Sequence, residues 1–121
     1  MSRLLPKWKR PEILEAVFDQ ISDALVLYDP SMHIVGANRA AERLFAMSGE
    51  MLVGRHCHEV FHCQDCQPGC GVLVGLEQAP SVSRSTVHLR TSNGHERIAV
   101  MSTQQLYDEN GRVDVVVAVF K

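Results

Sequence analysis

The first part of the chain carries a helical pattern of hydrophobic and polar positions. Pro11 opens the pattern, and acidic residues stand between its apolar positions. The apolar positions recur every three to four residues, at Ile13, Leu14, Val17, Phe18 and Ile21. This spacing places them on one face of a helix, and proline is favoured in a first helical turn. The pattern predicts an amphipathic helix over residues 11–22.

Farther along, short apolar or alternating runs are typical of strands. Turn residues such as Asp29-Pro30-Ser31 and Asn93-Gly94 separate these runs. Alternation, β-branched residues and such turns together indicate antiparallel strands. The predicted strands lie near residues 24–29, 33–37, 81–91, 95–107 and 112–120.

Between the second and third predicted strands the pattern favours short helices. Asn38 has the position of a helix cap, and the helix after it is expected to end near Ser48-Gly49. Residues 50–53 and 72–79 favour further short helices. Because helices and strands are segregated along the chain, we expect an α+β domain with one antiparallel sheet.

Length and charge limit the chain to one domain of ordinary size. It has 121 residues, 45% of them hydrophobic, and a formal net charge of −2. Domains usually run about 100–150 residues, so we expect a single domain over residues 11–121 and a basic tail over residues 1–10. The small net charge argues against direct nucleic-acid binding, and the apolar runs are too short for a membrane span. Without a signal-peptide pattern, a cytoplasmic protein is expected.

Residues 54–71 form a segment rich in cysteine and histidine, for which we expect a loop. In a reducing compartment, clustered cysteines are more often metal, cluster or redox sites than structural disulfides. The candidate cofactor-binding and metal-binding residues are Cys57, Cys63, Cys66 and Cys70. The histidines that could substitute for them as ligands are His56, His58 and His62.

The cysteine spacing, C-x5-C-x2-C-x3-C, leaves the bound species open. Thiolates suit a tetrahedral zinc ion or an iron–sulfur cluster. A thiol–disulfide switch is a further alternative, because protonated histidines nearby lower a thiol pKa. A last alternative is that the four cysteines are free thiols that bind no group. Covalent c-type haem is not expected, because Gln67 rather than histidine follows Cys66.

No P-loop, G-x-G-x-x-G or G-x-S-x-G motif occurs in the sequence. We therefore expect that the domain itself is not an enzyme.

Several segments, in this order, resemble the PAS domain, a sensory module of bacterial signalling proteins. The matching segments are FDQISDALVLYD at 18–29, IVGANRAA at 34–41, LVGR at 52–55 and DENGRV at 108–113. The resemblance covers nearly the whole chain, from about residue 12 to 121. It implies a five-stranded antiparallel sheet of order 2-1-5-4-3, flanked by short helices that enclose a pocket, with the N-terminal amphipathic helix beside it.

A closer similarity concerns the cysteine segment. GRHCHEVF at 54–61, followed by Cys66 and Cys70, resembles a cysteine-containing PAS subgroup of bacterial sensor histidine kinases and enhancer-binding transcription regulators. The chain departs from that subgroup in its extra Cys63 and in Gly71-Val72, where the subgroup often has Pro-Leu. GRHC also resembles the light-sensing flavin PAS subclass, but the residues after Cys57 differ from that subclass. A photoactive flavin is therefore not expected.

The resemblance implies a sensory or regulatory domain that detects a ligand, metal or redox state and passes the change to an output domain or dimer partner. We expect a homodimer through the N-terminal helix and the sheet, and an output domain outside this chain, because one PAS unit fills its length. Two alternatives stay open. One is a purely dimerising PAS module without cofactor, and the other is a thiol–disulfide redox protein acting through Cys63 and Cys66.

Overall fold

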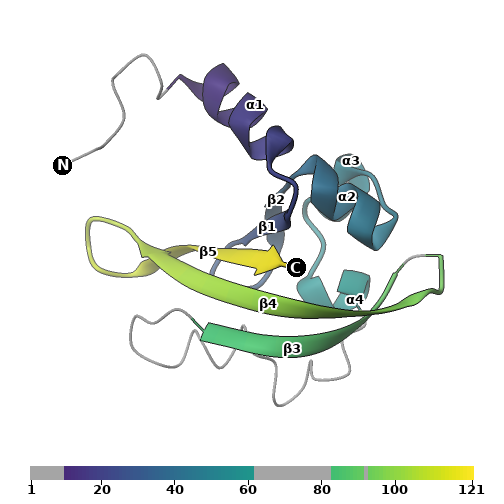
Figure 1. The fold of residues 1–121 in the computed structure, drawn as a ribbon. Helices are drawn as coiled ribbons and strands as arrows, with labels where there is room; N and C mark the ends of the chain where they lie inside the picture. Colours follow the sequence, from purple (N-terminus) through teal and green to yellow (C-terminus); the bar gives the residue numbers. More distant parts are fainter. Residues whose placement is uncertain (1–9, 62–82, 92) are drawn as a thin grey trace.

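The computed structural model describes residues 10–61, 83–91 and 93–121 of the chain. Figure 1 shows a curved sheet, with α2, α3 and α4 to one side of it and α1 projecting away. The elements, in chain order, are α1 (Pro11–Gln20), β1 (Ala24–Tyr28), β2 (Ile34–Ala37), α2 (Arg39–Phe45), α3 (Gly49–Leu52), α4 (Cys57–Phe61), β3 (Ser83–Arg90), β4 (Glu96–Tyr107) and β5 (Val113–Phe120).

The five strands form one antiparallel sheet in the order β2-β1-β5-β4-β3, which confirms the predicted order. Strand β5 lies at the centre, between β1 and β4. Ala24 of β1 pairs with Phe120, and Met101 of β4 pairs with the same residue from the other side. The last strand, β5, is therefore joined by backbone hydrogen bonds to the first strand, β1, and to β4.

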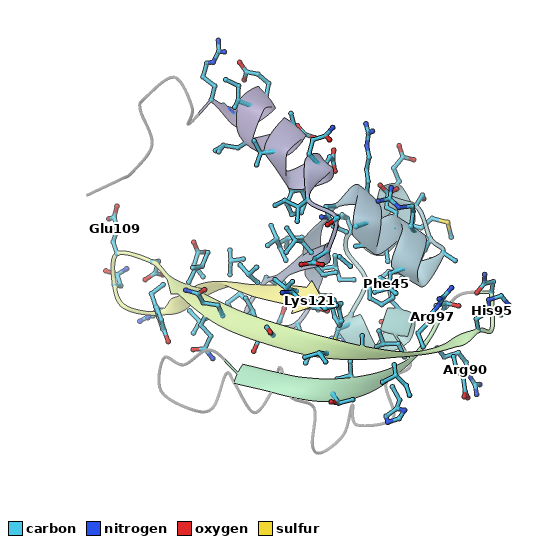
Figure 2. All side chains as sticks on the ribbon, in the orientation of Figure 1. Phe45, Arg90, His95, Arg97, Glu109 and Lys121 are labelled. Atoms are coloured by element: carbon cyan, nitrogen blue, oxygen red, sulfur yellow. The ribbon has the colours of Figure 1, made fainter. Side chains whose placement is uncertain are left out.

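One face of the sheet, named the inner face from here on, packs against the helices α2, α3 and α4. Strand side chains alternate between faces, and the buried set on this face comprises Ala24, Val26, Tyr28, Val87, Leu89, Ala99, Met101, Thr103, Gln105, Val116, Ala118 and Phe120. Phe45 of α2 is buried between this helix and the sheet (Figure 2), with its ring centre 5.4 Å from that of Phe120. This apolar layer is the hydrophobic core.

The opposite, outer face is also apolar but remains partly exposed. It carries Leu25, Leu27, Ile98, Val100, Leu106, Val115, Val117 and Val119. Helix α1 has no buried residue, and its Leu14 and Val17 are 44% and 55% exposed. The amphipathic helix predicted from the sequence is present, but its apolar side is not part of the core.

Asn38 holds the end of α1 to the rest of the domain. Its side chain is fully buried and caps α2, as the sequence predicts. Its Oδ1 accepts hydrogen bonds of 2.9 Å from the N–H groups of Leu25 and Ala41. Its Nδ2 donates at 3.0–3.3 Å to the carbonyl oxygens of Phe18, Ile21 and Asp23. A single side chain thus joins α1, β1 and α2.

Three details differ from the sequence predictions. α1 ends at Gln20, because Ile21 is extended. The helix after Asn38 ends at Phe45 instead of near Ser48, because Ala46 adopts a left-handed conformation and closes the helix with a hydrogen bond to Glu42. The segment 54–71, predicted as a loop, contains the helix α4 over Cys57–Phe61. The helix predicted at 72–79 lies outside the described residues.

Candidate functional site

Two polar side chains of β4 lie on the otherwise apolar inner face. Thr103 and Gln105 are 4% and 8% exposed. The Oε1 atom of Gln105 accepts a 2.7 Å hydrogen bond from the Tyr107 hydroxyl. The Thr103 hydroxyl makes no side-chain hydrogen bond within the part of the chain that the structure describes. A buried polar group without a partner costs about 1–3 kcal/mol, so a ligand that bonded to this hydroxyl would recover that free energy.

The residues that pair with Thr103 are small. Ala118 lies opposite it on β5, and Ser83 occupies the paired position on β3. The methyl side chain of Ala118 cannot form a hydrogen bond, so it offers the Thr103 hydroxyl no partner from β5. Thr103 is therefore the centre of the candidate ligand site on the inner face.

Cys57 lies in the core on the helical side of this face. It is the first residue of α4, is 7% exposed, and belongs to the same apolar cluster as Val60 and the inner face. Its N–H donates a 3.0 Å hydrogen bond to the carbonyl of Met32. A chemical change at Cys57 would therefore act through packing of α4 against the core.

The structure does not bring the other predicted ligands of the cysteine site into view. His58 belongs to α4, but nothing is described of its side chain. His62, Cys63, Cys66 and Cys70 lie outside the described residues. Among the residues described, no group of three histidine, cysteine, aspartate or glutamate side chains is arranged to hold a metal ion. The four-cysteine site stays a prediction.

His56 is the one predicted substitute ligand with a described side chain. It pairs with His33 in an isolated antiparallel bridge, and the two ring centres are 5.4 Å apart at an interplanar angle of 86°. In the turn before His33, the carboxylate of Asp29 accepts hydrogen bonds from three groups: the N–H of His33, the N–H of Ser31 and the Ser31 hydroxyl. Desolvation opposes ionisation of Asp29, but the hydrogen bonds from His33 and Ser31 outweigh it and lower the pKa of Asp29 below its usual value.

Sequence reasoning misses Thr103, Gln105 and His33. Alternation along β4 puts Thr103 and Gln105 on one face with Met101, but apolar residues occur on both faces of this strand, so the pattern does not show which face is buried. The pairing of His33 with His56 depends on a bridge between segments that are distant in sequence, and no local pattern reports it.

A shallow apolar groove lies between α1 and the β1–β2 edge of the sheet. Its volume is about 600 Å³, and its apolar lining includes Leu14, Phe18, Leu27, Val35 and Val53. The groove joins the exposed side of α1 to the outer face of the sheet. The carboxylates of Glu15, Asp19 and Glu42 also line it. The groove, Val17 of α1 and the outer-face residues Val115, Val117 and Val119 are together named the α1–outer-face surface from here on.

No helix in the described residues has the length and apolar character needed to cross a lipid bilayer.

A five-stranded antiparallel sheet of order β2-β1-β5-β4-β3 with short helices packed on one face makes the chain an α+β domain. The family profile of the PAS fold matches residues 18–121, which is most of the chain. This chain belongs to the PAS family. No curated protein matches it.

Solved structures with the same fold include several PAS domains, all of low sequence identity. An RNA-binding light-oxygen-voltage receptor superposes with a TM-score of 0.83 at 21% identity, over 100% of this chain and 35% of that one. This chain thus spans about a third of that receptor. A PAS domain from Colwellia psychrerythraea gives a TM-score of 0.75 at 19% identity, with 91% and 93% of the two chains covered. The PAS domain of nitrogen regulation protein NR(II) from Vibrio parahaemolyticus gives 0.73 at 16% identity, with 90% and 96% covered.

Proposed function

We propose that this PAS domain is the sensory domain of a signalling protein and that it detects a small polar ligand on the inner face of the sheet. The observation that carries the proposal is the Thr103 hydroxyl, which is buried on the inner face and has no side-chain hydrogen-bond partner among the described residues. A buried polar group of this kind favours a ligand that offers a hydrogen-bonding partner. The solved PAS domains of NR(II) and of a two-component sensor histidine kinase share the fold, which supports a signalling context.

A change on the inner face has a physical route to α1. Phe45 of α2 packs on the inner-face residue Phe120, and α2 is capped by Asn38, which also binds the carbonyl groups at the end of α1. An Asp19–Arg39 ion pair of 3.9 Å adds a second link between α1 and α2. A ligand that shifted α2 would therefore shift α1, provided that its affinity differs between the two arrangements.

The same proposal includes a homodimer whose arrangement changes when α1 shifts. The α1–outer-face surface combines exposed Leu14 and Val17 with the partly exposed valines of β5. Contiguous exposed apolar surface on a small domain marks an interaction site. A second copy of the chain presents the same surface and can cover it by twofold symmetry. A change in the arrangement of the two copies would then alter the activity of an output domain outside this chain.

A second candidate function is detection of a metal ion or redox state by the cysteines. The observation that favours it is the burial of Cys57 at the start of α4, in contact with the core of the domain. An iron–sulfur cluster, a zinc ion or a disulfide that included Cys57 would repack α4. Anaerobic purification followed by a visible spectrum and by iron, zinc and sulfide analysis tests this function. A colourless, metal-free protein with unchanged stability after Cys57→Ser would contradict it.

The ligand proposal is tested by thermal stability in the presence of a panel of small organic acids, amides and nucleobases. A compound bound at the inner face raises the melting temperature of the wild-type protein and has a smaller effect on Thr103→Val, which keeps the side-chain shape and removes the hydroxyl. Thr86→Val is the matched control, because Thr86 is exposed on β3. Equal stabilisation of wild type and Thr103→Val by every active compound would show that the site lies elsewhere.

A further inference from the structure

The histidines His33 and His56 are brought together by an isolated antiparallel bridge, with their rings in an edge-to-face arrangement. The backbone around the pair is held by two hydrogen bonds, from the N–H of Ile34 to the carbonyl of Arg55 at 2.9 Å and from the N–H of Cys57 to the carbonyl of Met32 at 3.0 Å. In this antiparallel pattern the two central residues form the narrow, non-hydrogen-bonded pair, whose side chains lie on the same side and close together. The ring centres are 5.4 Å apart.

A hydrogen-bonded chain orients the ring of His33. The Ser31 hydroxyl lies 2.7 Å from Oδ1 of Asp29 and 2.8 Å from Nδ1 of His33. A hydroxyl has one proton, which it donates to the ionised carboxylate, so it accepts from Nδ1–H of His33. The neutral ring then carries its lone pair on Nε2, the nitrogen that a metal ion requires. A carboxylate behind a ligating histidine is a common second layer of metal sites.

We propose that His33 and His56 bind one divalent transition-metal ion of the zinc, nickel and copper class, through one ring nitrogen each. Two imidazoles on one tetrahedral ion have ring centres roughly 5 Å apart, since a Zn–N bond is about 2.0–2.1 Å, and the observed separation agrees with this. Imidazole ligands suit these metals. Water completes the coordination, because the side chain of His33 is 47% exposed.

The site has a structural consequence for the domain. His33 follows the turn between β1 and β2, whereas His56 immediately precedes α4. A bound ion would therefore fasten the start of α4, and with it Cys57, to the β1–β2 turn. The proposed ion site uses neither Thr103 nor Gln105, and the side chain of His33 is 47% exposed whereas these two residues are buried.

Titration calorimetry of the full chain with Ni²⁺ alone tests the site. A second series uses a background in which Cys63, Cys66 and Cys70 are changed to serine, which removes the thiolates that compete for the metal. In that background His33→Gln and His56→Gln should each weaken Ni²⁺ binding at least tenfold. Ser31→Ala should weaken it several-fold through the lost orientation of His33. His88→Gln and His95→Gln are matched controls, because both histidines are exposed and lie outside the pair, and they should bind as the background does.

Three outcomes would overturn the proposal: no Ni²⁺ binding by the background protein, a His33→Gln variant that binds as tightly as the background, or an equal loss in His95→Gln. If only His56→Gln lost binding, His56 would act without His33, which also contradicts a paired site. Far-ultraviolet circular dichroism confirms that each variant is folded. Because His33 is exposed, His33→Gln keeps the test decisive even if His56→Gln does not fold.

Discussion

The two faces of the sheet differ in what covers them, although both are apolar. On the inner face, helices cover the strands, and the fully buried Phe45 of α2 packs on Phe120. Two polar groups, Thr103 and Gln105, interrupt this apolar layer. On the outer face, Ile98 is 70% exposed and the valines of β5 are half-buried. A face that is already covered can stabilise the fold and hold a small ligand, whereas a partly exposed apolar face gains free energy from a partner.

This difference assigns separate roles to neighbouring residues of one strand. In β4, Val100 faces outward and Met101 faces the core, so substitution of the first should affect association and substitution of the second should affect folding. Asn38 is the main described link between the two regions, because it binds both α1 and α2. The predictions below test whether folding and association separate in this way.

The largest expected effect is on the core. Phe45→Ala should lower the free energy of unfolding by about 3–5 kcal/mol, because it removes a fully buried ring that packs on Phe120. Ile98→Ala, on the outer face, should change it by less than about 0.5 kcal/mol in the monomer. Urea unfolding at low protein concentration measures both. Similar losses for the two variants would remove the distinction between the faces.

Asn38→Ala should lower the free energy of unfolding by about 3 kcal/mol. The half-buried N–H group of Leu25 and the buried N–H group of Ala41 lose their acceptor, and an unpaired buried group costs about 1–3 kcal/mol. Hydrogen exchange should also show faster exchange in α1. Ser48→Ala is the control: Ser48 caps α3 by a long, exposed hydrogen bond of 3.4 Å, so its loss should cost only about 0.5 kcal/mol. Unchanged exchange of α1 in Asn38→Ala would contradict the linking role of Asn38.

A charge on the exposed side of α1 should act on association and leave the fold intact. Val17 is 55% exposed, so Val17→Glu should fold normally and weaken the proposed homodimer at least tenfold, which corresponds to about 1.4 kcal/mol. Glu12→Gln, on the same helix, is the control for a change of charge alone. Sedimentation velocity over a range of concentrations measures the dissociation constant. A wild-type protein that stays monomeric at high concentration, or a Val17→Glu dimer of unchanged strength, would disprove this interface.

The sequence predicts much of this architecture because its signals are local. The spacing of Ile13, Leu14 and Val17, the cap at Asn38 and the turn at Asn93-Gly94 depend on neighbours in the chain, and the corresponding elements are present. The end of α2 at Ala46 is missed because a left-handed alanine is unusual and has no sequence signature.

The candidate sites are less predictable because they depend on tertiary pairing. Cys57 stands out by composition alone, but its burial follows from the packing of α4. The register of β4 against β5 decides that Thr103 faces Ala118, and an isolated bridge decides that His33 faces His56. Neither juxtaposition is encoded within one segment, so both appear only once the sheet is assembled.

The central claim, that the inner face keeps a hydrogen-bonding group for a ligand, is tested most directly by two threonine-to-valine substitutions. Thr91 and Thr103 are both 4% exposed, but the Thr91 hydroxyl bonds to Asn93 and to the carbonyl of His95. Urea unfolding of the ligand-free protein measures both variants. Thr91→Val should lower the free energy of unfolding by about 1 kcal/mol, whereas Thr103→Val should raise it by about 1 kcal/mol because it removes an unpaired buried hydroxyl. A loss in Thr103→Val equal to that in Thr91→Val would show that the Thr103 hydroxyl is already satisfied, and would contradict the claim.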